Sequence, residues 1–169
     1  MTSTSARPPI NLDLLGLYMS DHVAGATTGI ERVKRMAGAL AHTPHGPVLT
    51  AMAREFLAER AVYYDLMNRF GLPRRRHRQL IAWAGERAGR LKLNGAIFGT
   101  SPMTPLLEAE LMRAAVLGKI GGWQTLQAHH EELRIPRLTL EQLISQGERQ
   151  IEQFAAMHAD FRATAFRAK

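Results

Sequence analysis

The sequence predicts an all-α protein: four long helices in a bundle, with an extra helix in the connection between the second and the third of them. Two observations lead to this fold class. Residues that favour helix, above all Leu, Ala, Met, Arg, Glu and Gln, dominate the chain, whereas Val and Ile are scattered. In addition, apolar residues recur every three or four positions over stretches of roughly 25 to 30 residues, and glycine and proline separate these stretches.

The first two long helices are expected at residues 11–41 and 47–70. Asn11 can cap the first of them, because its side chain can accept a hydrogen bond from an N–H of the first turn. The sequence Thr43-Pro44-His45-Gly46-Pro47 then interrupts the apolar pattern, and Pro47 suits the first turn of the next helix. Short spacing between the two helices predicts an antiparallel hairpin.

The remaining helices are expected at residues 74–94, 104–133 and 139–165. The segment 74–94 is shorter than the others and forms the middle connection. Pro136 ends the helix that precedes it, and the sequence Thr139-Leu-Glu-Gln142 has the pattern of a capping box, in which two side chains satisfy N–H groups at a helix start. The last two long helices therefore form a second hairpin.

The lengths of the connections predict the topology. A middle connection of about 30 residues can run the whole length of the bundle, so the helices on either side of it can be parallel. Over residues 11–166 the chain resembles the ferritin-like superfamily, whose bundles are built as hairpin, long crossover and hairpin. The stretches 17–29 and 90–95 are similar to those of a bacterial subgroup of that superfamily. The resemblance implies a fold and carries no established activity.

Composition excludes several functions. Without cysteine the chain has no disulfide, no thiolate zinc site and no cysteine nucleophile. The net charge of +7 permits an anionic partner without requiring one. Residues 1–10 lack the apolar segment of a secretory signal and are expected to be a disordered arm before a single domain, residues 11–169. No apolar run is long enough to span a membrane, so a cytoplasmic protein without a membrane partner is expected.

The metal motif that the resemblance would bring is missing. Ferritin-like di-iron proteins carry a Glu on each of two helices and Glu-x-x-His on the other two. No glutamate of this chain is followed three positions later by a histidine. We therefore expect a bundle without a cofactor and without catalytic activity.

In place of a metal centre, the sequence predicts a polar cluster at mid-height of the bundle. Residues at similar distances from the end formed by the 43–47 turn come within about 10 Å of one another along the axis, at 1.5 Å per residue. Glu59 lies within the apolar stripe of its helix, and Lys119 shares a face with Met112 and Trp123. Lys119 is expected to neutralise several buried carboxylates. The predicted cluster consists of Glu31, Glu59, Lys119, Glu148 and Glu152.

Two alternative functions remain open at this stage. One is a divergent di-iron or di-manganese oxidase, or an iron-binding protein, with Glu110, His158 and His22 as further candidate ligands. His22 and His158 interrupt apolar stripes, although a histidine in such a place is more often a hydrogen-bonded core residue. The other is a nucleic-acid-associated bundle that binds phosphate through a basic patch in the crossover. This patch comprises Arg74, Arg75, Arg76 and Arg78.

Paired glycines indicate close packing. Gly25 and Gly29 lie four residues apart in one predicted helix, and Gly118 and Gly122 in another at a similar height. Because glycine lowers helix stability, such pairs predict a close approach of backbones, or a groove that takes a small ligand or a second subunit. A homodimer is expected.

Overall fold

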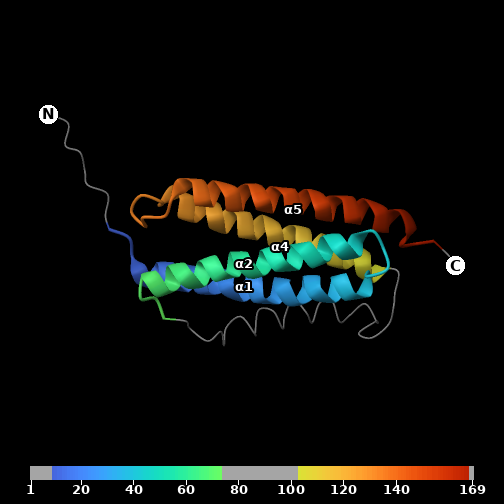
Figure 1. Cartoon of the computed structure of the whole chain (residues 1–169), viewed down its shortest axis with the longest axis horizontal. Helices are drawn as coiled ribbons and strands as arrows, with labels where there is room; N and C mark the ends of the chain where they lie inside the picture. Colours follow the sequence, from blue (N-terminus) through green and yellow to red (C-terminus); the bar gives the residue numbers. More distant parts are fainter. Residues whose placement is uncertain (1–8, 74–102, 168–169) are drawn as a thin grey trace.

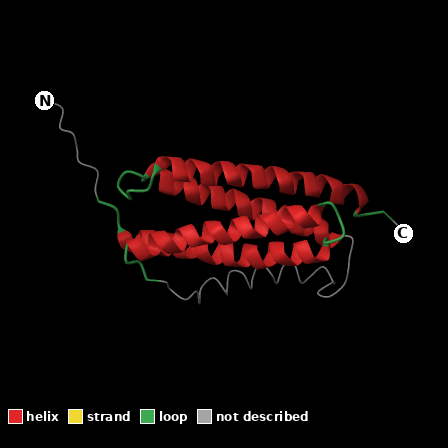
Figure 2. Cartoon of the chain, viewed as in Figure 1, coloured by secondary structure: helices red, strands yellow, loops and turns green. Residues whose placement is uncertain are grey.

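The computed structural model describes residues 9–73 and 103–167 (Figure 1). These residues form four helices and no strand, which confirms the predicted all-α class (Figure 2). The helices are α1 (Leu12–Ala39), α2 (His45–Arg69), α4 (Met103–Ala128) and α5 (Arg137–Thr164). The predicted crossover helix at 74–94 lies outside the described residues. In the described part of the chain no helix is long and apolar enough to cross a membrane.

The four helices pack as two hairpins. Helices α1 and α2 form one antiparallel pair and α4 and α5 the other, while α1 also contacts α4 and α2 contacts α5. Figure 1 shows that α2 and α4 run in the same direction, so α2 ends and α4 begins at opposite ends of the bundle. These four pairs are all antiparallel, and the two parallel pairs, α1 with α5 and α2 with α4, lie diagonally.

The helix ends agree with the predictions only in part. Asn11 caps α1 as predicted, since its side chain accepts a hydrogen bond from the Leu14 N–H at 3.1 Å. Helix α2 begins at His45, two residues before the expected start, because the Thr43 hydroxyl already accepts a hydrogen bond from the His45 N–H. The predicted capping box at Thr139 is wrong. Pro136, with a ψ of 124°, is the N-cap of α5 and the helix starts directly after it.

Helix α4 is shorter than expected. It ends at Ala128, and the following residues form a turn in which Arg134 has a positive φ of 49°. Two apolar side chains of this turn, Leu133 and Ile135, are buried and close one end of the core. Their burial explains why the apolar pattern in the sequence continues past the end of the helix.

A polar layer divides the core into two apolar halves. One half lies towards the α1–α2 turn and includes Ile30, Phe56, Val116 and Phe154. The other half includes Val23, Tyr63, Trp123 and Leu140. Glu59 on α2 and Gln150 on α5 lie between the two halves in the sequences of their helices. Lys119 on α4 lies one residue before Ile120, the last residue of the first half on that helix.

Of the four paired glycines, two are packed and two are open. A Cβ on Gly122 would lie 2.5 Å from the Tyr63 hydroxyl, and one on Gly29 would lie 3.8 Å from Met112 Cε. Gly25 and Gly118 have none of the described residues within 4 Å of the position of a Cβ. Side chains thus pack tightly against Gly122 and at ordinary contact distance against Gly29, and none of the four glycines shows the predicted close approach of another described helix backbone.

We predict that Gly46→Ala destabilises the protein, whereas Gly38→Ala does not. A Cβ on Gly46 would lie 2.7 Å from the Leu40 carbonyl oxygen and 2.9 Å from Ala41 Cα, and these backbone atoms cannot move without opening the α1–α2 turn. The expected loss in the free energy of unfolding is about 1 to 3 kcal/mol. Gly38 has open space around it and should gain up to about 1 kcal/mol. Urea denaturation measures both, and equal midpoints for the two variants would contradict the prediction.

Candidate functional site

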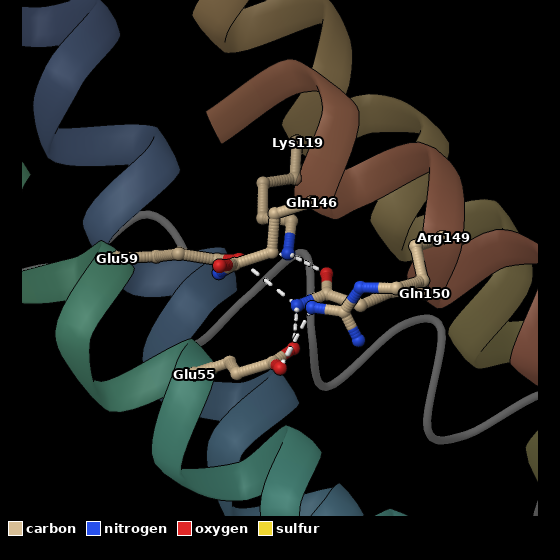
Figure 3. Close-up of polar contacts among 6 residues, drawn as sticks. All are labelled: Glu55, Glu59, Lys119, Gln146, Arg149 and Gln150. Atoms are coloured by element: carbon tan, nitrogen blue, oxygen red, sulfur yellow. Dashed lines mark hydrogen bonds and ion pairs between the residues drawn. The ribbon is translucent and has the colours of Figure 1, made fainter. Parts of the chain in front are cut away.

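Glu59 is the buried acid at the centre of the polar layer. It lies on α2 between Phe56 and Tyr63 and is only 3% exposed. Both of its carboxylate oxygens accept hydrogen bonds (Figure 3). Lys119 Nζ donates to Oε2 at 2.5 Å, and Oε1 accepts from Gln146 Nε2 at 2.7 Å and from Gln150 Nε2 at 3.0 Å.

Lys119 supplies the positive charge that Glu59 requires. Its ammonium donates to Glu59 and to the side-chain carbonyl oxygen of Gln150, and it lies 4.2 Å from the centre of the Phe56 ring. Burial lowers the pKa of Lys119, while the charge of Glu59 and the hydrogen bond to it act in the opposite direction. The pair is therefore a desolvated ion pair, in which each charge depends on the other.

Gln150 connects this pair to a second ion pair nearer the surface. The side chain is fully buried, and its amide nitrogen donates to Glu55 Oε2 at 2.7 Å as well as to Glu59. The exposed Arg149 donates to the other oxygen of Glu55 at 2.8 Å. Figure 3 shows the six side chains converging from α2, α4 and α5. We call these residues the Lys–Glu–Gln network: Glu55, Glu59, Lys119, Gln146, Arg149 and Gln150.

Charge is balanced within the network. Two carboxylates, Glu55 and Glu59, face two cations, Lys119 and Arg149, and the two glutamines supply neutral donors and an acceptor. A buried charge is tolerated when it is both paired and hydrogen-bonded, which is the case for Glu59. The arrangement ties three helices together at mid-height of the bundle.

The predicted cluster is correct for one pair of residues. Glu59 and Lys119 lie together, as expected from the apolar stripes on which they occur. Glu31, Glu148 and Glu152 do not join them, because all three side chains are exposed. Glu31 points outward and pairs with Lys34 at 3.2 Å. Glu148 and Glu152 are each two residues from Gln150, and a two-residue step turns a side chain to the far side of a helix.

Sequence reasoning missed Glu55, Gln146 and Gln150. The two glutamines lie on one line with Phe154 at a spacing of four residues, which places them on the core-facing side of α5. A search for acidic ligands alone passes over them, because neutral amides are not expected in a metal centre. The usable signal was a polar residue that interrupts an apolar stripe, whatever its charge.

The two candidate histidines lie in separate places. His158 Nε2 is 3.1 Å from Glu110 Oε1, between α5 and α4. His22 lies between two tyrosine rings, with centroid distances of 4.6 Å to Tyr18 and 5.6 Å to Tyr63. Burial lowers the pKa of His22, and the charge of Asp21 acts against this.

Within residues 9–73 and 103–167, no three His, Asp or Glu side chains are grouped closely enough to hold a metal ion. The basic patch of Arg74, Arg75, Arg76 and Arg78 falls outside this part of the chain.

An aromatic stack adjoins the Lys–Glu–Gln network on one side. Tyr63 follows Glu59 by one helical turn, and its ring stacks on Trp123 with the centroids 4.2 Å apart. The Tyr63 hydroxyl and the Trp123 indole nitrogen are buried and have no hydrogen-bond partner among the described residues. Burial raises the pKa of Tyr63, so the hydroxyl stays neutral beside Glu59.

No protein-family model matches this chain, and comparisons with curated proteins and with solved structures give no match either. The interpretation of the site therefore rests on its own geometry.

We predict that Lys119→Met strongly destabilises the protein. The change keeps most of the side-chain volume and removes the charge that neutralises buried Glu59, which should lower the free energy of unfolding by about 3 kcal/mol. Lys34→Met is the matched control, because Lys34 pairs with Glu31 where both side chains are about half exposed or more. That variant should change the free energy by less than about 0.5 kcal/mol in the same urea titration.

A double-variant cycle tests whether the cause is the unpaired charge. In Glu59→Gln/Lys119→Met no buried charge is left alone, so the loss should be smaller than the sum of the two single losses by about 1 to 3 kcal/mol. Additive losses would show that the residues act through packing and do not depend on each other.

We predict that His22 makes the protein less stable as the pH falls through its ordinary pKa of 6.5. The folded state has the lower pKa, so between the two values the unfolded chain binds more protons and acid favours unfolding. The slope from one group is at most about 1.4 kcal/mol per pH unit. His22→Gln should flatten the decline measured by urea denaturation from pH 7 downward, and the exposed His42→Gln serves as the control. An unchanged slope in His22→Gln would reject this role.

Proposed function

We propose that this chain is a non-catalytic helical-bundle protein with a ferritin-like architecture, in which the Lys–Glu–Gln network takes the place of a metal centre. The observation that carries the proposal is the position of Lys119. Its ammonium bonds to Glu59 and Gln150 at mid-height of the bundle, where the helices of a ferritin-like protein present metal ligands inward.

The topology supports the ferritin-like part of the proposal. The described helices form two antiparallel hairpins, and α2 and α4 are parallel, so the first hairpin ends and the second begins at opposite ends of the bundle (Figure 1). Bundles with one long crossover connection have this arrangement.

The chemistry of the network supports the other part of the proposal, namely that the network takes the place of a metal centre. A site for two hard cations needs several carboxylates with free lone pairs directed at one point. Here the oxygens of Glu59 accept hydrogen bonds from an ammonium and from two amides, and Glu55 accepts from Arg149 and Gln150. A cation entering between them would have to displace these donors and would be repelled by Lys119. The network supplies the charge neutralisation that a metal would otherwise provide.

A network of this kind favours one alignment of the helices. If α4 or α5 slid by one turn, Glu59 would lose its partners and keep its buried charge, at a cost of several kcal/mol. We infer that the network selects the helix register, and that the protein acts through its surfaces and not through chemistry at its centre.

Metal binding tests this proposal against a divergent iron or manganese protein. Protein purified without an affinity tag should hold no stoichiometric iron or manganese, and added Mn²⁺ or Fe²⁺ should leave its melting temperature unchanged. The comparison variant is Lys119→Glu, in which three carboxylates face one another without the ammonium. This variant should be destabilised and should regain stability when Mn²⁺ is added, because a ligand that binds only the folded state stabilises it.

Two outcomes would overturn the proposal. One is a wild-type protein that contains bound metal in stoichiometric amount. The other is a wild-type melting temperature that rises with Mn²⁺ as much as that of Lys119→Glu.

A further inference from the structure

Helix α4 carries a second apolar stripe on its outer side. Its core stripe includes Met112, Val116 and Trp123, all of them buried. The outer stripe has alternating spacings of four and three residues, the pattern by which one helix packs along another. None of its members is buried in this structure. The outer stripe consists of Leu107, Leu111, Ala114, Gly118, Gly121 and Thr125.

The neighbouring part of α1 continues this surface. The Tyr18 hydroxyl donates to Thr125 Oγ1 at 2.9 Å, so the two residues lie at the same height on the two helices. Leu14 and Gly25 share a helix face with Tyr18, one turn before it and two turns after it. Leu14 is 64% exposed. Leu117 is 63% exposed and borders the outer stripe on the side of α5, because it lies two helical turns after Glu110, which contacts His158 of α5. We call this surface the α1–α4 face.

Three glycines on the α1–α4 face make no close contact with the described residues. Gly25, Gly118 and Gly121 are in helix interiors, and a Cβ on any of them would meet none of these residues within 4 Å. A glycine in the middle of a helix lowers its stability relative to alanine. Close approach of a backbone from outside is the physical reason to place glycine at such a position.

The distribution of charge indicates the partner. The chain has a net charge of +7, so two copies repel each other on most approaches. Residues 14–28 of α1 contain one charged residue, Asp21, and residues 114–128 of α4 contain only Lys119, which points inward to Glu59. Two copies can meet here without repulsion between cations. Towards the other end of the face, Arg32 lies on the same line of α1 as Gly25 and pairs with Glu108 of α4 at 2.6 Å. This cation is therefore already neutralised and offers little to a nucleic acid or an acidic protein.

The size of the face is sufficient for a dimer. The stretch from residue 107 to residue 128 of α4 is about 30 Å long, and two helices side by side are about 20 Å wide. This gives roughly 600 Å² for each copy and about 1,200 Å² for the pair, where specific interfaces begin.

We propose that the α1–α4 face joins two copies of this chain in a symmetric dimer. In a two-fold arrangement the two α4 helices cross antiparallel, and each copy presents the same residues to the other. Gly118 is near the middle of the outer stripe, so the two Gly118 residues lie close to the axis. The leucines on either side, Leu117 among them, are buried by the partner.

Sedimentation equilibrium of the full chain and two variants tests the proposal. The wild type should be a dimer. Leu117→Glu buries two acids in the interface and should weaken dimerisation at least about tenfold. Leu138→Glu is the matched control, since Leu138 is 65% exposed near the start of α5. Figure 1 shows α5 on the opposite side of the bundle from α1. It should leave the dissociation constant unchanged, and circular dichroism should show both variants to be as helical as the wild type.

Cysteine cross-linking provides a second, independent measurement. Because the chain has no cysteine, a single introduced one can form only an intermolecular disulfide. Gly118→Cys has room for its side chain and should oxidise to a covalent dimer, whereas Leu138→Cys should not. A wild type that stays monomeric at the highest concentration reached overturns the proposal, whatever covers the face instead. Equal dissociation constants for the two glutamate variants, or equal cross-linking of the two cysteine variants, overturn it as well.

Discussion

The buried charge of Glu59 on α2 determines how the hairpin of α4 and α5 packs against the hairpin of α1 and α2. A carboxylate that is 3% exposed must have a cation and hydrogen-bond donors, because an unpaired buried charge costs several kcal/mol. Lys119 provides the cation, and Gln146 and Gln150 provide the donors. These partners come from α4 and α5, so the position of one residue on α2 dictates how the second hairpin must sit against the first. The hydrophobic effect alone would not specify this relative position of the hairpins, since apolar side chains can pack in many registers.

The division of the core into two halves follows from the same constraint. Phe56 and Tyr63, one turn on either side of Glu59, belong to different apolar clusters. Replacing a buried ion pair by apolar residues of similar volume is often neutral or stabilising, so the network is not explained by stability alone. Its value lies in uniqueness: a bundle with a continuous apolar core can slide by a turn at little cost, whereas this one cannot.

The all-α fold class and the pairing of Glu59 with Lys119 could both be predicted from the sequence, because both follow from helical periodicity. Helical periodicity shows which face of a helix is buried, and Glu59 and Lys119 are visible because they interrupt that face. Height along the axis is a weaker guide. Glu31 lies at the height of the network but on the outer side of α1. An estimate of height alone could not reveal this, because it ignores rotation about the helix axis. The burial of Gln150 could have been predicted from its place on the line of Phe154, but its partners could not, because no property of α5 alone reveals that a neutral amide bridges Glu55 and Glu59.

The inward orientation of Lys119 connects the centre of the bundle to its surface. Residues 114–128 of α4 have one charged side chain, and the network takes that side chain into the core. The outer side of this part of α4 is consequently uncharged in a chain whose net charge is +7. Had the lysine faced solvent, the α1–α4 face would carry a cation beside Gly118 and would repel a second copy. One residue therefore does two things at once: it neutralises Glu59 inside the bundle, and it leaves the glycines and leucines of α4 free to meet an identical surface.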